Sequence, residues 1–274
     1  MYKYLILFAL LCIGTAIDLI SIPLVRTMLI SSGLIRENYR GEKIPVSMGI
    51  CFVPTILVNA IVLLYCNVNL EKKVDIFIFL FAVVSMSFVG VIDDILGNRK
   101  VTGLKGHFKA LLRGRLTTGG FKAILGGIVG LVVSTSISDN IIGIIIGTLV
   151  VALSANFMNL FDLRPGRAIK VFFVIAIVIF IFTNINQKEI MALMLPAVWT
   201  YFYFDLKAKT MMGDSGSNLL GISIGVFIVE FYDIKIQICW LIFMIAIHLF
   251  AEKYSITKLI EKNKVLSFLD LLGR

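Results

Sequence analysis

Long apolar runs separated by short polar segments set the strongest limit on how this chain can fold. Nine spans are expected, at residues 4–25, 47–66, 74–93, 120–138, 140–159, 168–185, 189–206, 217–232 and 235–251. Such runs suit helices that cross the roughly 30 Å hydrocarbon core of a bilayer, where a helix satisfies its own backbone hydrogen bonds. Only 16% of the residues are charged, against about 25% in a soluble domain. The sequence therefore predicts an all-α, polytopic integral membrane bundle of about nine transmembrane helices in a single domain, 1–274.

The basic residues predict the orientation of this bundle. With nine spans, most Lys and Arg fall in segments on one side, and the exceptions are Lys3, Lys72, Lys73, Lys188 and Lys235. Because Lys and Arg concentrate in cytoplasmic loops, we expect a multi-pass protein of the cell (inner or plasma) membrane, with its N-terminus outside and its C-terminus in the cytoplasm. These loops account for the net charge of +9, so no nucleic-acid partner is expected.

The C-terminal segment Lys253–Arg274 alternates apolar residues with lysines at roughly helical spacing. This pattern is typical of an amphipathic helix in the membrane interface. A simple C-terminal anchor is the alternative.

Four polar clusters lie at the predicted cytoplasmic face, and two of them belong to the same stretch of chain, the end of the third span and the loop that follows it. Asp93 and Asp94 end the third span. Adjacent carboxylates repel unless a cation offsets them, although two solvated acids at a helix end are the simpler interpretation. Further along, Gly103–Lys109 precedes more basic residues. Lys109 and its neighbours suit phosphate binding, or they are ordinary cytoplasmic loop charge.

A third cluster ends the fifth span. Asn156 and Asn159 are three residues apart and share one helix face, which Asp162 extends. Amides in a lipid-facing helix are costly unless they meet partners or a wet cavity. Pro165 and Gly166 then break the helix and let the backbone approach a ligand. Helix-packing amides followed by a turn are the alternative.

The fourth cluster opens the eighth span. Gly213 and Gly216 flank Asp214 and Ser215, at a point where a helix start leaves backbone N–H groups free. This arrangement suits a phosphate and a hard metal ion, whereas the alternative is an N-capping turn. Carboxylates, basic groups and an anion-binding helix start at one membrane face together indicate a metal and a phosphorylated substrate. The apolar surroundings indicate that one substrate is a lipid.

These motifs, in this order, resemble those of the polyprenyl-phosphate N-acetylhexosamine-1-phosphate transferases (glycosyltransferase family 4 type). This superfamily includes phospho-N-acetylmuramoyl-pentapeptide transferase and the UDP-GlcNAc:undecaprenyl-phosphate GlcNAc-1-phosphate transferases. The shared order is Asp-Asp, Gly-Leu-x-x-x-x-Lys, Asn-x-x-Asn-Leu-x-Asp and Gly-Asp-x-Gly-Ser, from about residue 36 to about 225.

The resemblance implies transfer of a sugar 1-phosphate from a UDP-sugar to a polyprenyl (undecaprenyl) phosphate, with release of UMP, in cell-envelope glycan synthesis. It implies Mg²⁺, or Mn²⁺ in its place, on Asp214. The implied catalytic residues are Asp93, Asp94, Asp162 and Lys109. The implied substrate-binding residues are Asn156, Asn159, Arg164, Arg167, Lys43, Gly213 and Ser215. The expected partners are the membrane, the lipid phosphate and the nucleotide sugar, with a homodimer as a candidate assembly.

The chain also departs from the family pattern. The family often reads Asp-Gly-x-Asp-Gly where this chain continues from Asp162 to Pro165 and Gly166, and the histidine cluster of its last cytoplasmic loop is missing. These differences leave open an alternative function, a lipid-phosphate binding or transport protein of the same fold that has lost catalysis.

Overall fold

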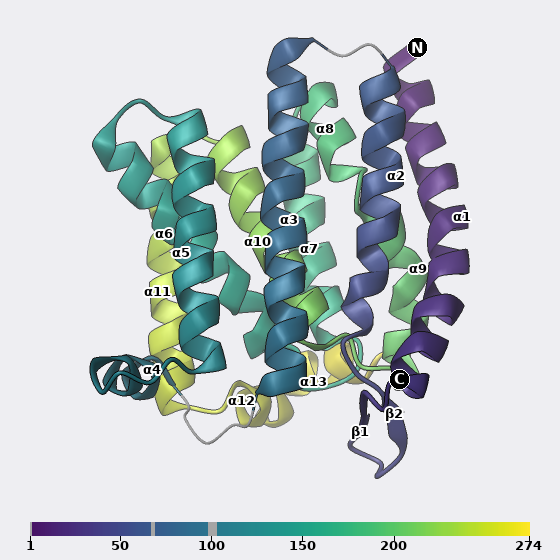
Figure 1. The fold of residues 1–274 in the computed structure, drawn as a ribbon, viewed down its shortest axis with the longest axis vertical. Coiled ribbons are helices and arrows are strands. Elements are labelled where there is room, and N and C mark those ends of the chain that lie inside the picture. Colours follow the sequence, from purple (N-terminus) through teal and green to yellow (C-terminus); the bar gives the residue numbers. More distant parts are fainter. Residues whose placement is uncertain (1, 67–68, 98–102) are drawn as a thin grey trace.

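The computed structural model describes residues 2–66, 69–97 and 103–274, which form a bundle of helices (Figure 1). The elements are α1 (Tyr2–Ser31), β1 (Ile35–Glu37), β2 (Lys43–Pro45), the 3-10 helix η1 (Met48–Cys51), α2 (Phe52–Tyr65), α3 (Leu70–Leu96), α4 (Gly103–Leu112), α5 (Thr118–Ile137), α6 (Ile141–Phe157), the 3-10 helix η2 (Met158–Leu160), α7 (Arg167–Phe182), α8 (Ile185–Met191), α9 (Leu195–Leu206), α10 (Gly213–Phe231), α11 (Ile234–Lys253), α12 (Ile256–Lys262) and α13 (Lys264–Leu271). We call the end with β1, β2, α4, α12 and α13 the lower end, and the opposite end, with α8, the upper end (Figure 1).

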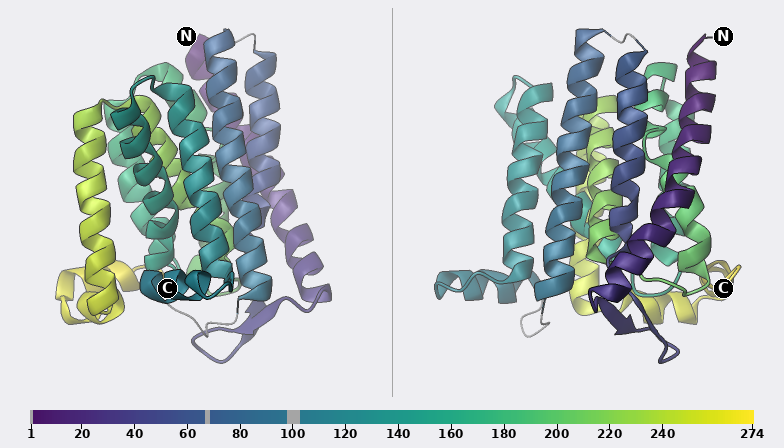
Figure 2. Two further views of the ribbon diagram at one scale, coloured as in Figure 1. Left: turned by 60° about the vertical axis from the view of Figure 1, so that its left-hand side comes forward. Right: turned by 45° about the vertical axis from the view of Figure 1, so that its right-hand side comes forward.

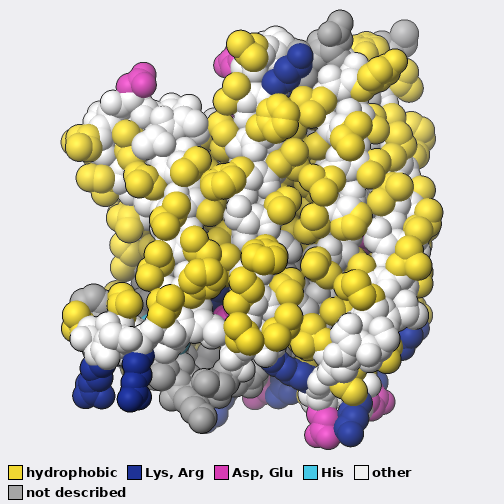
Figure 3. All heavy atoms as spheres, viewed as in Figure 1, with side chains coloured by type: hydrophobic (Ala, Val, Ile, Leu, Met, Phe, Trp, Pro, Cys, Tyr) yellow, Lys and Arg dark blue, Asp and Glu magenta, His cyan; other side chains and the backbone are white. Residues whose placement is uncertain are grey.

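Among the described residues, six helical segments are long and apolar enough to cross a membrane: α1, η1 with α2, α3, α5, α6 with η2, and α11. Hydrophobic side chains cover the middle of the face seen in Figure 3, whereas Lys and Arg gather along its lower edge. An apolar band of this kind is expected where lipid is the solvent. The predicted helical membrane bundle is therefore confirmed, with fewer spans of full length than the nine expected.

The span predicted at 189–206 is wrong as a single helix. Asn184 and Gln187 form a capping box that starts the short helix α8, and Pro196 lies in the first turn of α9. Between them, the Asn59 side chain of α2 donates hydrogen bonds to the carbonyls of Ala192 (3.4 Å) and Leu193 (3.2 Å). Backbone groups freed by a helix break must find such partners inside a bilayer, so Asn59 stabilises the break.

Helix α10 lies at the centre of the bundle, packed against α3 and α6, and most of its residues are buried. Glycine permits this close approach. A Cβ atom at Gly90 of α3 would lie 2.2 Å from the Asp214 carbonyl oxygen, and one at Gly221 would lie 2.1 Å from that of Ser154. Small residues at helix interfaces in membranes allow backbones to approach in this way. The first turn of α10 is thereby held against the end of α3.

Short elements that the sequence did not reveal cover the lower end (Figure 2). Strands β1 and β2 form an antiparallel hairpin in which Arg36 is opposite Ile44. The tail is helical, as predicted, but in two pieces. Asn263 separates them, because its side chain accepts hydrogen bonds from the N–H groups of Val265 and Leu266 and so starts α13.

Candidate active site

Two predicted acids meet at the lower end through a lysine. The Lys122 ammonium, in the first turns of α5, lies 2.7 Å from Asp214 Oδ2 and 3.2 Å from Asp93 Oδ2. Its side chain is only 15% exposed. The lysine therefore offsets the repulsion between two carboxylates from separate helices. From the sequence alone, Lys122 is only one of the basic loop residues. Its position at the start of an apolar helix could have marked it as a candidate site residue.

Asp94 has a different partner from its neighbour Asp93. Its two carboxylate oxygens accept hydrogen bonds from the backbone N–H groups of Asp214 (3.1 Å) and Ser215 (3.3 Å). Asp94 is 5% exposed and serves as a cap for α10 supplied by another helix. Gly213 fits beside it with a φ of +72°, where a Cβ would lie 2.5 Å from Asp94 Oδ2. The predicted helix-start anion site is thus occupied by a carboxylate of the protein itself.

The asparagine motif reaches the same helix start. Asn159 Nδ2 donates to Asn218 Oδ1 at 2.8 Å, and the Ser217 hydroxyl donates to Asn159 Oδ1. Ser217 and Asn218 are fully buried. Asn156 lies half-buried one turn before Asn159. Two motifs about 60 residues apart in sequence are therefore joined side chain to side chain.

Asp162 follows η2 in the loop that leads to α7. Burial raises the pKa of Asp162 well above its usual value, and the nearby carboxylates of Asp205 and Asp214 add to the shift. Asp205, which sequence reasoning missed inside an aromatic helix, is 4% exposed. Its Oδ2 accepts a hydrogen bond of 2.8 Å from the Gly166 N–H. An acidic environment of this kind favours a cation.

The residues present fit a magnesium ion that is held partly by the protein and partly by substrate phosphates. Within the described ranges, no three acidic, histidine or cysteine side chains form a ready-made metal site. Magnesium in phosphoryl-transfer sites is commonly held by one or two carboxylates together with substrate phosphates. Asp93 and Asp214, which share the Lys122 ammonium, supply oxygen donors of that kind.

Three of the predicted basic residues make no contact with Asp93 or Asp214 among the ion pairs of the described residues. Lys43 in β2 and Lys109 in α4 are exposed. Arg164 pairs with Glu261 at 3.8 Å and lies 5.9 Å from the centre of the Tyr39 ring. Neither contact of Arg164 places its side chain between Asp93 and Asp214, where Lys122 lies.

Arg167, predicted to bind substrate, is bonded to the C-terminal tail in the structure. Its guanidinium is 3% exposed and donates to both carboxylate oxygens of Asp270, at 2.8 and 2.9 Å, and to Thr257 at 2.9 Å. Three of its five N–H donors are therefore taken by the C-terminal tail. In this structure Arg167 packs the tail against the start of α7.

Comparison with known proteins agrees with the motifs. The model of glycosyl transferase family 4 matches residues 76–232, a range that runs from α3 to the end of α10 and includes the acids and asparagines described above. Among curated proteins, none matches the chain. Since the family match covers more than half of the 274 residues, the chain belongs to glycosyl transferase family 4, the family of phospho-N-acetylmuramoyl-pentapeptide transferase and the GlcNAc-1-phosphate transferases.

Proposed function

We propose that this protein transfers a sugar 1-phosphate from a UDP-sugar to a polyprenyl phosphate and releases UMP, with Mg²⁺ as cofactor. One observation carries the proposal. The Asp93–Lys122–Asp214 group lies beside the Asn159 and Asp162 motif, within the range that matches a family of sugar-phosphate transferases.

In the proposed reaction, an oxygen of the lipid phosphate attacks the phosphorus that carries the sugar. The bond from that phosphorus to the UMP oxygen breaks, and UMP leaves with the electron pair. Phosphoryl transfer depends mostly on positioning and on charge neutralisation. Asp214 and Asp93 would hold magnesium, which supplies charge neutralisation at the diphosphate. Lys122 would pair with phosphate oxygens once the carboxylates engage the metal.

An apolar groove offers a place for the lipid. A cavity of about 390 Å³ is lined by hydrophobic residues of α7, α11, α12 and α13 and by Phe161, next to Asp162. The charged residues Arg167, Lys170 and Asp270 also line it. A hydrocarbon chain in this groove would bring its phosphate towards the acidic site, because the groove reaches the loop that carries Asp162.

We propose that the lower end faces the cytoplasm, where UDP-sugars are made. Support comes from the Lys and Arg side chains along this end (Figure 3). Fusions after Arg274 test the orientation. A fluorescent protein should fold and fluoresce there, and an alkaline phosphatase should be inactive. The opposite pair of results would contradict the proposal.

The test of activity uses purified protein, undecaprenyl phosphate, Mg²⁺ and a panel of UDP-sugars, with UMP release as the signal. Asp214→Asn should lower the rate by at least about 10³-fold, since it removes the charge proposed to hold the metal. The control is Asp139→Asn, in the exposed turn between α5 and α6. A parent protein that binds the lipid phosphate and yields no UMP from any UDP-sugar would favour the binding or transport function.

A further inference from the structure

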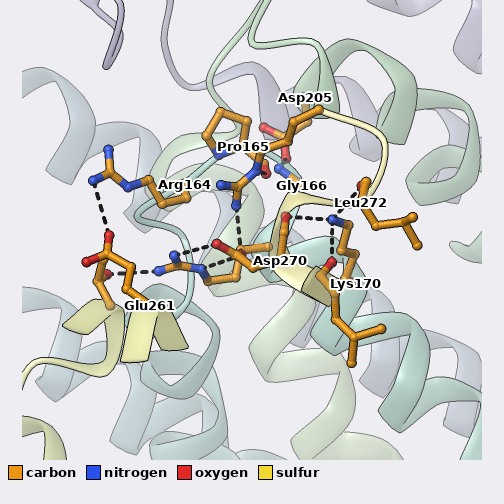
Figure 4. Close-up of polar contacts among 12 residues, drawn as sticks. Arg164, Pro165, Gly166, Lys170, Asp205, Glu261, Asp270 and Leu272 are labelled. Atoms are coloured by element: carbon orange, nitrogen blue, oxygen red, sulfur yellow. Dashed lines mark hydrogen bonds and ion pairs between the residues drawn. The ribbon is translucent and has the colours of Figure 1, made fainter. Parts of the chain in front are cut away.

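The loop that carries Asp162 is held in place by side chains from other segments. This loop, residues 161–166, joins η2 to α7. Arg274 Nε donates to the Pro165 carbonyl at 2.8 Å, and Asp205 accepts from the Gly166 N–H at 2.8 Å (Figure 4). Gly166 has a φ of +73°, a backbone conformation that glycine adopts readily. The loop therefore depends on α9 on one side and on the C-terminal tail on the other.

Asp270 of α13 bonds both arginines that lie next to the 161–166 loop, Arg167 and Arg274. Besides Arg167, it accepts a hydrogen bond of 2.7 Å from Arg274 Nη2. Arg167 directly follows Gly166 in the chain, and Arg274 contacts Pro165. Asp270 is 9% exposed. One buried carboxylate thus orders two arginines, and each arginine fixes a different part of the loop. Paired, charge-assisted hydrogen bonds of this kind are stronger and more directional than neutral ones.

Lysines fix the end of α13 to the bundle. Lys170 of α7 donates to the carbonyls of Leu269, Asp270 and Leu272 at 2.8–2.9 Å. Lys207, directly after α9, donates to the Gly273 carbonyl at 2.8 Å. Cations at a helix C-terminus satisfy carbonyls that have no partner within the helix. The tail is consequently a built part of the lower end and not a loose anchor.

We infer that Asp270 is a positioning residue for the reaction, acting through Arg167 and Arg274 to hold the Asp162 loop in its working conformation. The catalytic consequence rests on the proposed function. Asp270 is paired with Arg167 and Arg274 and not with the carboxylates of the site, so its effect on those carboxylates passes through the loop backbone. It also lines the groove proposed for the lipid. Misplacement of a substrate-positioning loop by about 1 Å lowers rates by as much as about 10²-fold.

The test compares three variants of the full chain in lipid nanodiscs. Asp270→Asn keeps the side-chain shape and removes the charge, whereas Asp270→Glu keeps the charge. Gln237→Ala is the matched control, because Gln237 is also buried and its side chain donates hydrogen bonds to the carbonyls of Val229 and Tyr232 at the upper end. The measurements are thermal unfolding, hydrogen–deuterium exchange of residues 161–168, and the KM for donor and for acceptor.

Asp270→Asn should raise exchange in 161–168 about tenfold and raise the donor KM about tenfold. Asp270→Glu should recover most of both effects. Gln237→Ala should lower the unfolding midpoint, and it should leave the exchange of residues 161–168 and the donor KM unchanged. A rise in the acceptor KM alone would reflect the groove that Asp270 also lines, and it would overturn the inference. Unchanged exchange in Asp270→Asn, an equal rise in Gln237→Ala, or a disordered loop with normal kinetics would each overturn the inference. If the parent protein releases no UMP from any UDP-sugar, the proposed function has failed, and the exchange comparison still decides whether the tail orders the loop.

Discussion

The two ends of the bundle both carry acids and lysines, yet they differ in what surrounds them. At the lower end, Asp94 accepts hydrogen bonds from the start of α10, and Lys122 joins Asp93 to Asp214. The upper end has a cavity of about 910 Å³ with Glu189 and Glu230 in its wall. Each of these two glutamates has one buried oxygen with no partner among the described residues.

This difference shows that charged side chains alone do not define an active site. The lower acids come from separate helices and meet asparagines, a glycine-flanked helix start and a lysine at hydrogen-bonding distance. The upper acids line a wide space, and Lys72 forms an ion pair with Glu189. We expect loss of function from changes at the lower end and loss of stability from changes at the upper end.

Among the changes that compare the two ends, the largest effect is expected for Lys122→Met. Removal of this ammonium leaves Asp93 and Asp214 to repel each other and takes a positive charge from the transferred phosphate. The value of kcat/KM should fall about 10²–10³-fold, as for loss of one electrostatic group in an active site, measured by UMP release. Lys109→Met, on the exposed face of α4, should lower it less. The reverse order would favour the catalytic role predicted for Lys109 and count against the role proposed for Lys122.

At the upper end, Lys72→Met should act on stability. Glu189 is 2% exposed, so loss of its ion-pair partner leaves a buried charge uncompensated. The free energy of unfolding should fall by about 3 kcal/mol, measured by denaturant titration in detergent. Activity per folded molecule should stay near that of the parent. A loss of activity beyond the loss of folded protein would show that the two ends are coupled.

A smaller effect is expected where α10 meets α6. Gly221→Ala forces a Cβ to within 2.1 Å of the Ser154 carbonyl, and overpacking of this kind costs about 1–3 kcal/mol. Leu149→Ala, at an exposed position of α6, is the control for thermal unfolding. Equal unfolding midpoints for the two variants would mean that α10 does not need this close contact.

The smallest effect is expected when the pH is lowered. Burial opposes the charge of Asp270, but hydrogen bonds and attraction from Arg167, together with Arg274, lower its pKa below the usual value. A carboxyl with a lowered folded pKa stabilises the fold above its unfolded pKa of about 3.9, and this contribution disappears as the pH falls through the folded value. Hydrogen exchange of residues 264–273 should therefore rise below about pH 4. Asp270→Asn should show fast exchange at every pH, and a parallel pH response in that variant would assign the transition to another group.

The sequence was most informative where a property is local. Apolar runs predicted the membrane bundle, and the motifs predicted that Asp93, Asp94, Asn159 and Asp214 belong to one site, which their contacts support. The break between α8 and α9 was not predicted, because it depends on Asn59 from α2. The pairing of Lys122 was missed for the same reason, since a lysine in a basic loop looks like any other until α5 is placed.

By itself, the sequence determined that lipid surrounds the helices and which family the motifs belong to. Runs of apolar residues require lipid around the helices, and the motifs contain the acids and amides of a phosphate-transfer family. Only the tertiary structure decided which of these groups are free and which are already paired. Asp94 is paired with the start of α10, and Arg167 with Asp270 of the tail. Such pairing depends on distances between segments far apart in the chain, and local sequence carries no record of those distances.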